Sequence, residues 1–296
     1  MSNAEKFIER WQHAWAQMDP QIWAELYHRE GTLLQPGMVR PISRSEIPAH
    51  VGRINALLPD IKCEMRNWAA KDDIVFTEWT ITAHLFGQPI EWSGCDRFTL
   101  AGDHAIEEVV HFDTLPLWAN LDPTMKRGGL LPGIGSPTSA VGSLAVPSGP
   151  ISAPNPDPEQ FMRGYSSLWR NADPALIENV YHPAWRGRSP TVGADAMIVR
   201  TDLDAYLELT KTTLPDYRLE VVRWAARADV VFIEWFVEGT FGGERIRWEG
   251  IDRQTLFGPQ SIEGVSYFDS LVLWSRLDPS MKRPFMLAAA SEMTNG

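Results

Sequence analysis

Residues 59–127 read PDIKCEMRNWAAKDDIVFTEWTITAHLFGQPIEWSGCDRFTLAGDHAIEEVVHFDTLPLWANLDPTMKR, and residues 215–283 read PDYRLEVVRWAARADVVFIEWFVEGTFGGERIRWEGIDRQTLFGPQSIEGVSYFDSLVLWSRLDPSMKR. The two stretches align without a gap at an offset of 156, and 34 of the 69 positions are identical. Upstream the offset becomes 154, so that Trp15 aligns with Trp169. The chain is therefore a tandem repeat of one domain.

Three helices are predicted at the start of each copy. In the first copy the aromatic residues at positions 7, 11 and 15 recur every four residues and form one stripe of a helix. Asp19-Pro20 supplies a cap and a proline for a short second helix that continues to His28. Residues 43–46 form a capping box, which predicts a third helix that ends before residue 59.

From residue 61 the spacing of apolar residues falls to two. Four β-rich segments, CEMRNWAA, DIVFTEWTITAHLF, IEWSGCDRFTL and AIEEVVHFDTL, are separated by short turns. Consecutive strands with such short links pair as antiparallel hairpins. We therefore expect an α+β fold of two tandem cone-shaped domains, each with three N-terminal helices packed on a curved antiparallel sheet, and a pocket between the helices and the sheet.

The repeat divides the chain into four parts. Residues 1–127 and 158–285 are the two predicted domains, residues 128–157 are a Pro/Gly/Ser-rich linker, and residues 286–296 are a C-terminal tail. A linker of this length spans about 30 Å if it is unrestrained, which allows the two copies to pair as an intramolecular pseudo-dimer. Further pairing of two chains as a homo-oligomer stays open.

Composition narrows the classes of partner. A formal charge of -11 argues against nucleic acid and against anionic membranes. No apolar run approaches the ~20 residues of a membrane span, and the N-terminus lacks the apolar core of a signal peptide. The only cysteines, Cys63 and Cys95, lie in different predicted strands, and no histidine or cysteine spacing resembles a metal site. We expect a cytoplasmic protein that needs no metal or other cofactor.

Three motifs carry a resemblance to a known family. They are the Leu-Pro-Asp that ends the third helix, the Trp-x-Gly-x-Asp-Arg strand, and the closing Ile-Glu…Phe-Asp-x-Leu-x-Leu-Trp segment. In these motifs and in the order of its elements, each copy resembles the SnoaL-like polyketide cyclases, which belong to the ketosteroid isomerase superfamily with the nuclear transport factor 2-like fold. The resemblance implies the fold more strongly than the function, because this superfamily contains isomerases, cyclases, lyases and binding modules.

The resemblance implies a general acid/base at the aspartate that closes the last long strand. The matching residues are Asp113 and Asp269, and His111 and Tyr267 lie two positions before them. Residues two apart share a strand face, so each pair is expected to project side by side, where an apolar roof would move their pKa values toward neutrality. The structural alternative is that the aspartates cap their strand ends and that His111 and Tyr267 are satisfied core residues.

Strand parity supplies a second pair of carboxyl groups. Trp92 shares a face with Asp96, as Trp248 does with Asp252, and we expect the aspartates in the pocket with the following arginines outside. A buried, neutral carboxylic acid could donate a hydrogen bond to a developing oxyanion, as in ketosteroid isomerase. A structural ion pair that repeats with the duplication explains the pattern equally well.

The remaining candidates fall into two groups. At the predicted end of the second helix, near the pocket rim, lie the substrate-binding candidates Tyr27, His28, Tyr181 and His182. A histidine at a helix C-terminus is also favoured by the helix dipole alone. The strand residues Glu78 and Glu234 are expected on a solvated face rather than in the site.

The sequence therefore predicts a cofactor-independent acid–base enzyme, either an isomerase, a cyclase or a lyase. Its substrate would be a hydrophobic aromatic or polyketide-like small molecule, with lignin-derived aromatics among the candidates. The alternative is a pair of non-catalytic small-molecule-binding or dimerisation modules, and a third option is one catalytic copy beside one silent copy. A cavity bordered by Asp113 or Asp269 would support the enzyme, and its absence would remove that support.

Overall fold

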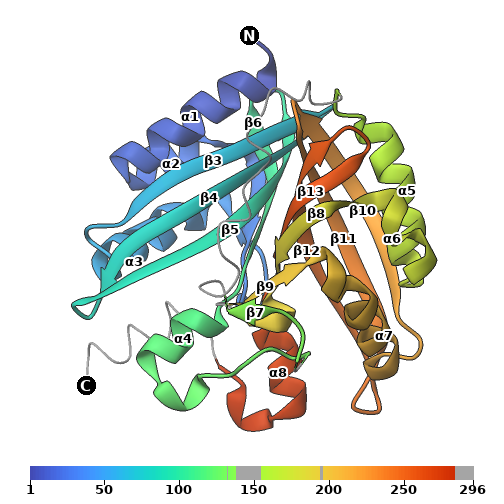
Figure 1. Ribbon diagram of the computed structural model, residues 1–296. Coiled ribbons are helices and arrows are strands. Elements are labelled where there is room, and N and C mark those ends of the chain that lie inside the picture. Colours follow the sequence, from blue (N-terminus) through green and yellow to red (C-terminus); the bar gives the residue numbers. More distant parts are fainter. Residues whose placement is uncertain (132, 138–154, 194–195, 284–296) are drawn as a thin grey trace. The chain divides into compact units, whose positions relative to one another are not determined.

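A computed structural model describes residues 1–131, 133–137, 155–193 and 196–283. The chain forms two compact units (Figure 1), and each corresponds to one copy of the repeat apart from its closing residues. The first contains Met1–Pro123 with residues 281–283 of the described chain, and the second is Thr124–Ser280. The predicted α+β fold with two tandem domains is confirmed, and each unit is described below by itself.

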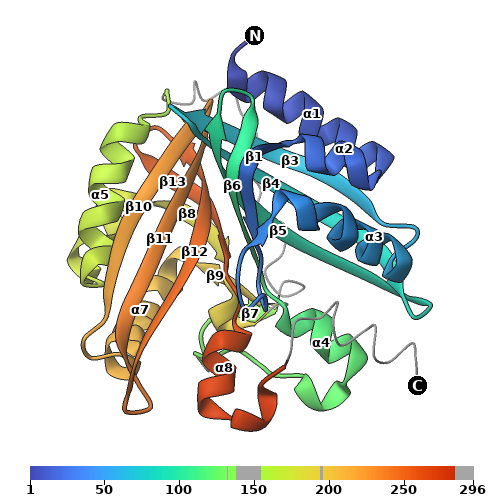
Figure 2. The same ribbon diagram turned by 180° about the vertical axis from the view of Figure 1, so that it is seen from behind.

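The three predicted helices of the first copy are present, and the second and third begin at the predicted caps. Helix α1 (Asn3–Gln17) starts at a capping box formed by Ser2 and Glu5 and buries its aromatic stripe. Helix α2 (Pro20–Glu25) is capped by Asp19, whose carboxylate accepts two backbone N–H bonds. The 3-10 turn η1 (Arg44–Glu46) leads into α3 (Ile47–Leu57). These helices cover one face of the first sheet (Figures 1 and 2).

Four long strands form the predicted antiparallel meander. They are β3 (Lys62–Lys71), β4 (Ile74–Leu85), β5 (Gln88–Ala101) and β6 (His104–Phe112). Tight turns join them, with left-handed backbone at Asp72 and Gly87, where φ is 55° and 77°. The whole sheet runs in the order β2-β1-β6-β5-β4-β3. Helix α4 (Leu115–Leu121) and the 3-10 turn η2 (Pro123–Met125) follow β6.

The sheet departs from the prediction at one edge. Tyr27 and His28 do not end a helix, because they open strand β1 (Tyr27–Leu34), which pairs with the short β2 (Ile42–Ser43) and lies parallel to β6. This parallel pair is an exception in a sheet whose other pairs are antiparallel, as predicted. A register shift between Tyr27 and Thr32 breaks the alternation of buried and exposed residues, which removes the period-two signal from this strand.

The second copy repeats these elements. Its helices are α5 (Pro158–Arg170), α6 (Ile177–Val180), α7 (Leu203–Thr213) and α8 (Leu271–Leu277), with 3-10 turns η3 (Pro174–Leu176), η4 (Pro190–Val192), η5 (Arg200–Asp202) and η6 (Pro279–Met281). Its strands are β8 (Tyr181–Arg188), β9 (Ala196–Val199), β10 (Arg218–Arg227), β11 (Val230–Phe241), β12 (Glu244–Phe257) and β13 (Gln260–Tyr267). The sheet order is β10-β11-β12-β13-β8-β9-β7, and β13 pairs in parallel with β8.

The first part of the predicted linker belongs to the second unit. Strand β7 (Ser136–Pro137) pairs with β9, and the Leu131 N–H donates a 3.0 Å hydrogen bond to the Thr191 carbonyl. Gly129 packs so closely on η4 that a Cβ there would lie 2.5 Å from the Val192 carbonyl carbon. Residues 128–131 are therefore docked, whereas the rest of the predicted linker at 138–154 and the predicted tail at 286–296 lie outside the described residues.

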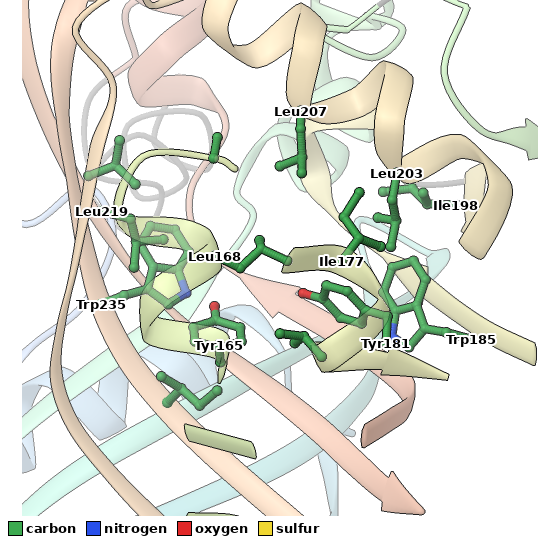
Figure 3. Packing of buried hydrophobic residues seen from close by; sticks show 14 of the residues in the cluster. Tyr165, Leu168, Ile177, Tyr181, Trp185, Ile198, Leu203, Leu207, Leu219 and Trp235 are labelled. Carbon is green, nitrogen blue, oxygen red and sulfur yellow. The ribbon is translucent and has the colours of Figure 1, made fainter. Parts of the chain in front are cut away.

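Each unit has its own apolar core between helices and sheet. Helix α1 of the first copy packs on β5, where the Phe7 and Phe98 ring centroids are 4.7 Å apart. In the second copy Tyr165 of α5, Tyr181 of β8 and Trp235 of β11 belong to one buried cluster (Figure 3). Aromatic residues thus fill the space that the sequence assigns to a pocket, and a cavity remains in each copy. None of the described helices combines the length and hydrophobicity that a membrane crossing requires.

Candidate functional site

The first copy encloses a cavity of about 140 Å³ between its helices and its sheet. Helices α1, α2 and α3 contribute one wall, and strands β1, β4, β5 and β6 contribute the other. The polar or aromatic lining residues are Trp15, Trp23, Tyr27, Gln35, His50, Trp79, Trp92, Asp96, Glu108, Phe112 and Thr114. Most of the remaining lining is aliphatic, so any carboxyl group in this wall is held away from water.

Asp96 of β5 lies in this wall and is 3% exposed. The Trp79 ring lies close to Gly94 of β5, where a Cβ would come within 2.4 Å of a ring carbon. This close approach, which needs glycine, aims the Trp79 Nε1–H at Asp96 Oδ1 over 2.8 Å. Thr77 donates a weaker bond of 3.3 Å to the other oxygen. Burial raises the pKa of Asp96 to about 7, against the lowering effect of these two donors.

Glu108 of β6 is a second buried carboxyl group in the same wall, and it is 4% exposed. It lies directly opposite Phe98, so it shares a sheet face with Asp96, and the Tyr27 hydroxyl donates a hydrogen bond to it. Burial raises the pKa of Glu108 to about 8. No residue-type pattern predicted this group, since the Glu107-Glu108 pair gives no indication of which glutamate faces inward.

The repeat itself holds a signal that could have identified Glu108. In the second copy the facing pair Phe98 and Glu108 is replaced by Gln254 and Gly264. A Cβ at Gly264 would lie 2.7 Å from Gln254 Oε1, so the Gln254 side chain occupies the space that Gly264 leaves. Two directly opposed positions that change together between copies indicate a packed, buried site rather than a surface.

His50 of α3 also lines the first cavity, and it is buried. Burial, together with the charge of nearby Arg53, lowers the pKa of His50 to about 4. The imidazole is therefore neutral at pH 7 and supplies no positive charge to Asp96 or Glu108. Of the described groups in this wall, the two carboxyls are the ones whose pKa values lie near neutrality.

The second copy has a cavity of about 100 Å³ built around Asp252. Trp235 Nε1 donates to one oxygen of Asp252 over 2.9 Å, as Trp79 does in the first copy, and Gly250 again permits the close approach of the ring. The other oxygen accepts a 2.7 Å hydrogen bond from the Tyr165 hydroxyl. Burial raises the pKa of Asp252 against these donors. This carboxyl group therefore has stronger partners than Asp96 has.

Asp113 and Asp269 are not among the residues that line either cavity. Each follows its closing strand and accepts a backbone N–H bond two residues ahead, from Leu115 over 3.1 Å and from Leu271 over 3.2 Å. Such a backbone N–H bond is the structural alternative to catalysis for an aspartate at a strand end. The support for catalysis that depended on these aspartates is therefore absent, and the cavity carboxyls take their place in the argument.

His111 and Tyr267 are also absent from the lining of both cavities. His111 lies opposite Cys95 and so faces the other side of the sheet from Asp96. It is buried there, where burial and the charge of Arg97 lower its pKa to about 3. Tyr267 is likewise buried and lies opposite Ile251. The expected pairing of these two residues with a cavity carboxyl is not found.

The other predicted residues divide between the cavities and the rim. Trp92 and Tyr27 line the first cavity, and Trp248 lines the second. Tyr181 accepts a 2.8 Å hydrogen bond from Trp169 Nε1 and borders a smaller pocket on the other side of Asp252. His28 and His182 line neither cavity, and each accepts a backbone N–H bond two residues ahead in its own strand, from Glu30 and Ala184.

The arginines that follow the cavity aspartates point away from them, as strand parity predicts. Arg97 pairs with Glu107 and Arg253 with Glu263 on the opposite face of each sheet. The expectation of a solvated face is wrong for Glu78, which is buried and accepts a hydrogen bond from Asn67, and for its counterpart Glu234, which pairs with Arg223. Glu78 and Glu234 are therefore more buried in their sheets than the sequence pattern indicated.

The described residues contain no group of three His, Cys, Asp or Glu side chains arranged to hold a metal ion. Cys63 and Cys95 are both free thiols. The groups that the structure brings together in the first cavity are two carboxyls and aromatic rings. Such a site can bind an apolar molecule and transfer a proton.

Comparison with known proteins identifies the family. Residues 8–109 and 162–257 both match the SnoaL-like domain, and together these matches cover more than half of the chain. The chain therefore belongs to the SnoaL-like domain family, with one domain in each copy. No curated protein matches the sequence significantly.

Solved structures similar to this chain include three from bacteria. AclR, a hydroxylase candidate from Streptomyces galilaeus, is 17% identical and covers 41% of this chain and 98% of its own, with a TM-score of 0.37. IdmH, a candidate polyketide cyclase from Streptomyces antibioticus, is 16% identical and covers 40% of this chain and 97% of its own, with a TM-score of 0.36. A candidate SnoaL-like polyketide cyclase from Jannaschia sp. CCS1 is 14% identical and covers 39% of this chain and 91% of its own, with a TM-score of 0.36.

Proposed function

We propose that this protein is a cofactor-independent acid–base enzyme, an isomerase, cyclase or lyase, that acts on a hydrophobic aromatic or polyketide-like small molecule. The observation that carries the proposal is Asp96, a buried carboxyl group in the wall of an aromatic cavity with a pKa raised to about 7. A pKa near the working pH is the condition under which a general base is both ionised and basic. Polyketides and lignin-derived aromatics both suit the apolar lining.

The two carboxyls of the first cavity take complementary roles in this proposal. Near pH 7 a large fraction of Asp96 is ionised, whereas Glu108, with a pKa of about 8, is mostly protonated. Asp96 removes a proton from a carbon next to a carbonyl group, and its carboxylate becomes a carboxylic acid. The electron pair moves to the carbonyl oxygen, which accepts a hydrogen bond from protonated Glu108. Tyr27 holds Glu108 in position.

The proton on Asp96 then completes the reaction. Its return to a different carbon gives an isomer, whereas attack of the enolate on a second carbonyl group closes a ring. Departure of a β-substituent instead gives a lyase. An apolar lining favours each of these steps because it leaves the ionised base poorly hydrated. Trp79 contributes as well, because its hydrogen bond holds the Asp96 carboxylate in one orientation.

Catalysis is assigned to the first copy, and the second copy is proposed as a binding module. Gly264 replaces Glu108 there, so the second cavity has no counterpart of the proposed acid. Asp252 is also held by the hydroxyl of Tyr165 in addition to Trp235. Hydrogen bonds to the ionised form make a carboxylate a weaker base. This difference favours ligand binding over proton transfer in the second copy.

A generic proton-transfer substrate tests the proposal without knowledge of the natural substrate. With 5-nitrobenzisoxazole, a base removes the C3 proton, the N–O bond breaks, and a coloured cyanonitrophenolate forms. We expect kcat/KM to rise with pH through a midpoint near 7, because Asp96 acts in its ionised form. Asp96→Asn should lower kcat/KM by about 10²-fold or more.

The matched control is Glu91→Gln, which removes one carboxylate from the exposed side of the same strand and should leave the rate unchanged. A rate for Asp96→Asn equal to that of the wild type would overturn the proposal. A loss from Asp252→Asn as large as that from Asp96→Asn would contradict the assignment of catalysis to the first copy. Circular dichroism of each variant verifies that it is folded.

A further inference from the structure

The first cavity contains two carboxyl groups and no basic side chain. None of its lining residues is Lys or Arg, and the described residues place no cation within ion-pair distance of Asp96 or Glu108. Buried carboxyls in proteins are normally paired with a positive charge or a metal. His50 cannot serve, because its imidazole is neutral at pH 7.

Aromatic rings line much of the same cavity. Trp15 and Trp23 stand nearly perpendicular, with an interplanar angle of 86° and centroids 5.1 Å apart. The sheet side contributes Trp79, Trp92 and Tyr27. Faces of tryptophan and tyrosine attract cations, and several such faces around one space are the known arrangement for alkylated ammonium groups.

Two buried indole N–H groups in this wall, those of Trp15 and Trp23, have no hydrogen-bond acceptor among the described residues. Trp23 is more than nine-tenths buried. An indole N–H in a buried position is normally satisfied. An acceptor on the apolar body of a ligand would satisfy these donors.

The second copy lacks the second carboxyl, although its cavity is also lined by aromatic rings, and Trp169 and Tyr206 there stand at 85° with centroids 6.1 Å apart. In the alignment of the two copies Trp23 corresponds to Ile177, and Glu108 corresponds to Gly264. Asp252, the remaining carboxyl, is satisfied by neutral donors. The second carboxyl is therefore the feature that is particular to the first copy.

We propose that the first cavity recognises an organic cation, a tertiary or quaternary ammonium group attached to an aromatic or similarly apolar body. Ionised Asp96 provides the countercharge near neutral pH, Glu108 adds a second negative charge when it ionises at higher pH, and the aromatic rings of the lining contact the alkyl groups on nitrogen. A formal charge of -11 on the chain attracts such a ligand from solution. The inference rests on the first cavity being the functional site proposed above, and it names the class of substrate.

The proposal fixes how affinity depends on pH. The groups that face the carboxyls are Tyr27 from β1, His50 from α3, Cys63 from β3, and Thr77 and Trp79 from β4. Burial raises the pKa of the Cys63 thiol, and the pKa of His50 is about 4, so both are neutral between pH 6 and 9. The pKa values of Asp96 and Glu108 lie within that range, so both carboxyls lose protons there. Affinity for a cation should therefore increase from pH 6 to pH 9.

A pair of isosteric probes tests the proposal. Phenyltrimethylammonium and tert-butylbenzene have the same shape and differ in the charge on one atom, and quenching of tryptophan fluorescence reports their binding. At pH 9 we expect the cation to bind at least about tenfold more tightly than the neutral isostere. The preference should diminish at pH 6 and should disappear in the double variant with Asp96→Asn and Glu108→Gln.

The matched control is again Glu91→Gln, which should retain the full preference. Glu108→Gln alone should reduce the preference, so the test stands even if the double variant does not fold. Equal affinity of the two probes at pH 9, or a preference that persists in a folded double variant, overturns the inference. If the benzisoxazole rate still depends on Asp96 in that case, the acid–base proposal stands and only the ligand class is wrong.

Discussion

Replacement of Glu108 by glutamine should change how the stability of the protein depends on pH. Burial raises the pKa of Glu108 from 4.5 to about 8, so the folded protein binds a proton that the unfolded chain releases above pH 4.5. This contribution to stability is fully present below pH 4.5 and is lost as pH rises toward 8. Because one unit of pKa difference corresponds to about 1.4 kcal/mol, the loss amounts to roughly 5 kcal/mol.

Glutamine keeps the shape of the side chain and an oxygen that accepts the hydrogen bond from the Tyr27 hydroxyl, but it does not ionise. Urea denaturation at pH 5, 6, 7, 8 and 9 should show Glu108→Gln gaining on the wild type as pH rises, with the difference approaching a limit near pH 9. Glu91→Gln should follow the wild type. Parallel pH dependences of Glu108→Gln and the wild type would refute the reasoning, because they would show that Glu108 titrates as an exposed glutamate does.

Three further predictions concern the elements around the cavities. Gly94→Ala should destabilise the protein by about 1–3 kcal/mol and displace Trp79 from Asp96, since the new Cβ would overlap the ring. Gly52→Ala, in open space within α3, should instead stabilise the protein by up to about 1 kcal/mol. Denaturation curves of both variants test this, and equal effects on stability would contradict the close approach of Trp79 to Gly94. Asp113→Ala should lower stability by about 1 kcal/mol through loss of the Leu115 N–H bond and leave the benzisoxazole rate unchanged, so a lost rate would return Asp113 to the site. Leu131→Ala should lower the free energy of unfolding by about 2 kcal/mol or more, because Leu131 is buried. The variant should also speed entry of a fluorescent apolar dye into the second cavity only, because Leu131 is part of the wall of that cavity. Unchanged stopped-flow kinetics of dye entry would show that residues 128–131 do not restrict access.

Much of the fold could be predicted because its signals are local. The internal repeat is visible as sequence identity, and Ser2, Asp19 and the capping box at residues 43–46 mark helix starts that depend on neighbouring residues alone. Strand β1 was not predicted, because its register shift hides the alternation that defines a half-buried strand. Its parallel partner β6 is distant in sequence, and no local signal connects the two.

The sequence could predict a site residue only where its spacing from another residue of the same strand decides which sheet face it lies on. Trp92 and Asp96 share a face with each other by spacing alone, and the structure places both in the first cavity. Whether His111 shares that face depends on its register with β5, which a single strand does not contain. Which of Glu107 and Glu108 faces the cavity depends on the same register between β5 and β6. The alignment of the copies provides the missing information, since Glu108 and the residue opposite it change together.

The central claim is that Asp96 is a buried carboxyl group whose proton affinity suits proton transfer near neutral pH. The most direct measurement is a pH titration of the aspartate side-chain carboxyl signals by carbon-13 NMR, with the Asp96 signal assigned by its absence from Asp96→Asn. The account predicts a midpoint near 7 for this signal. A midpoint at the ordinary value of 3.8 would contradict it.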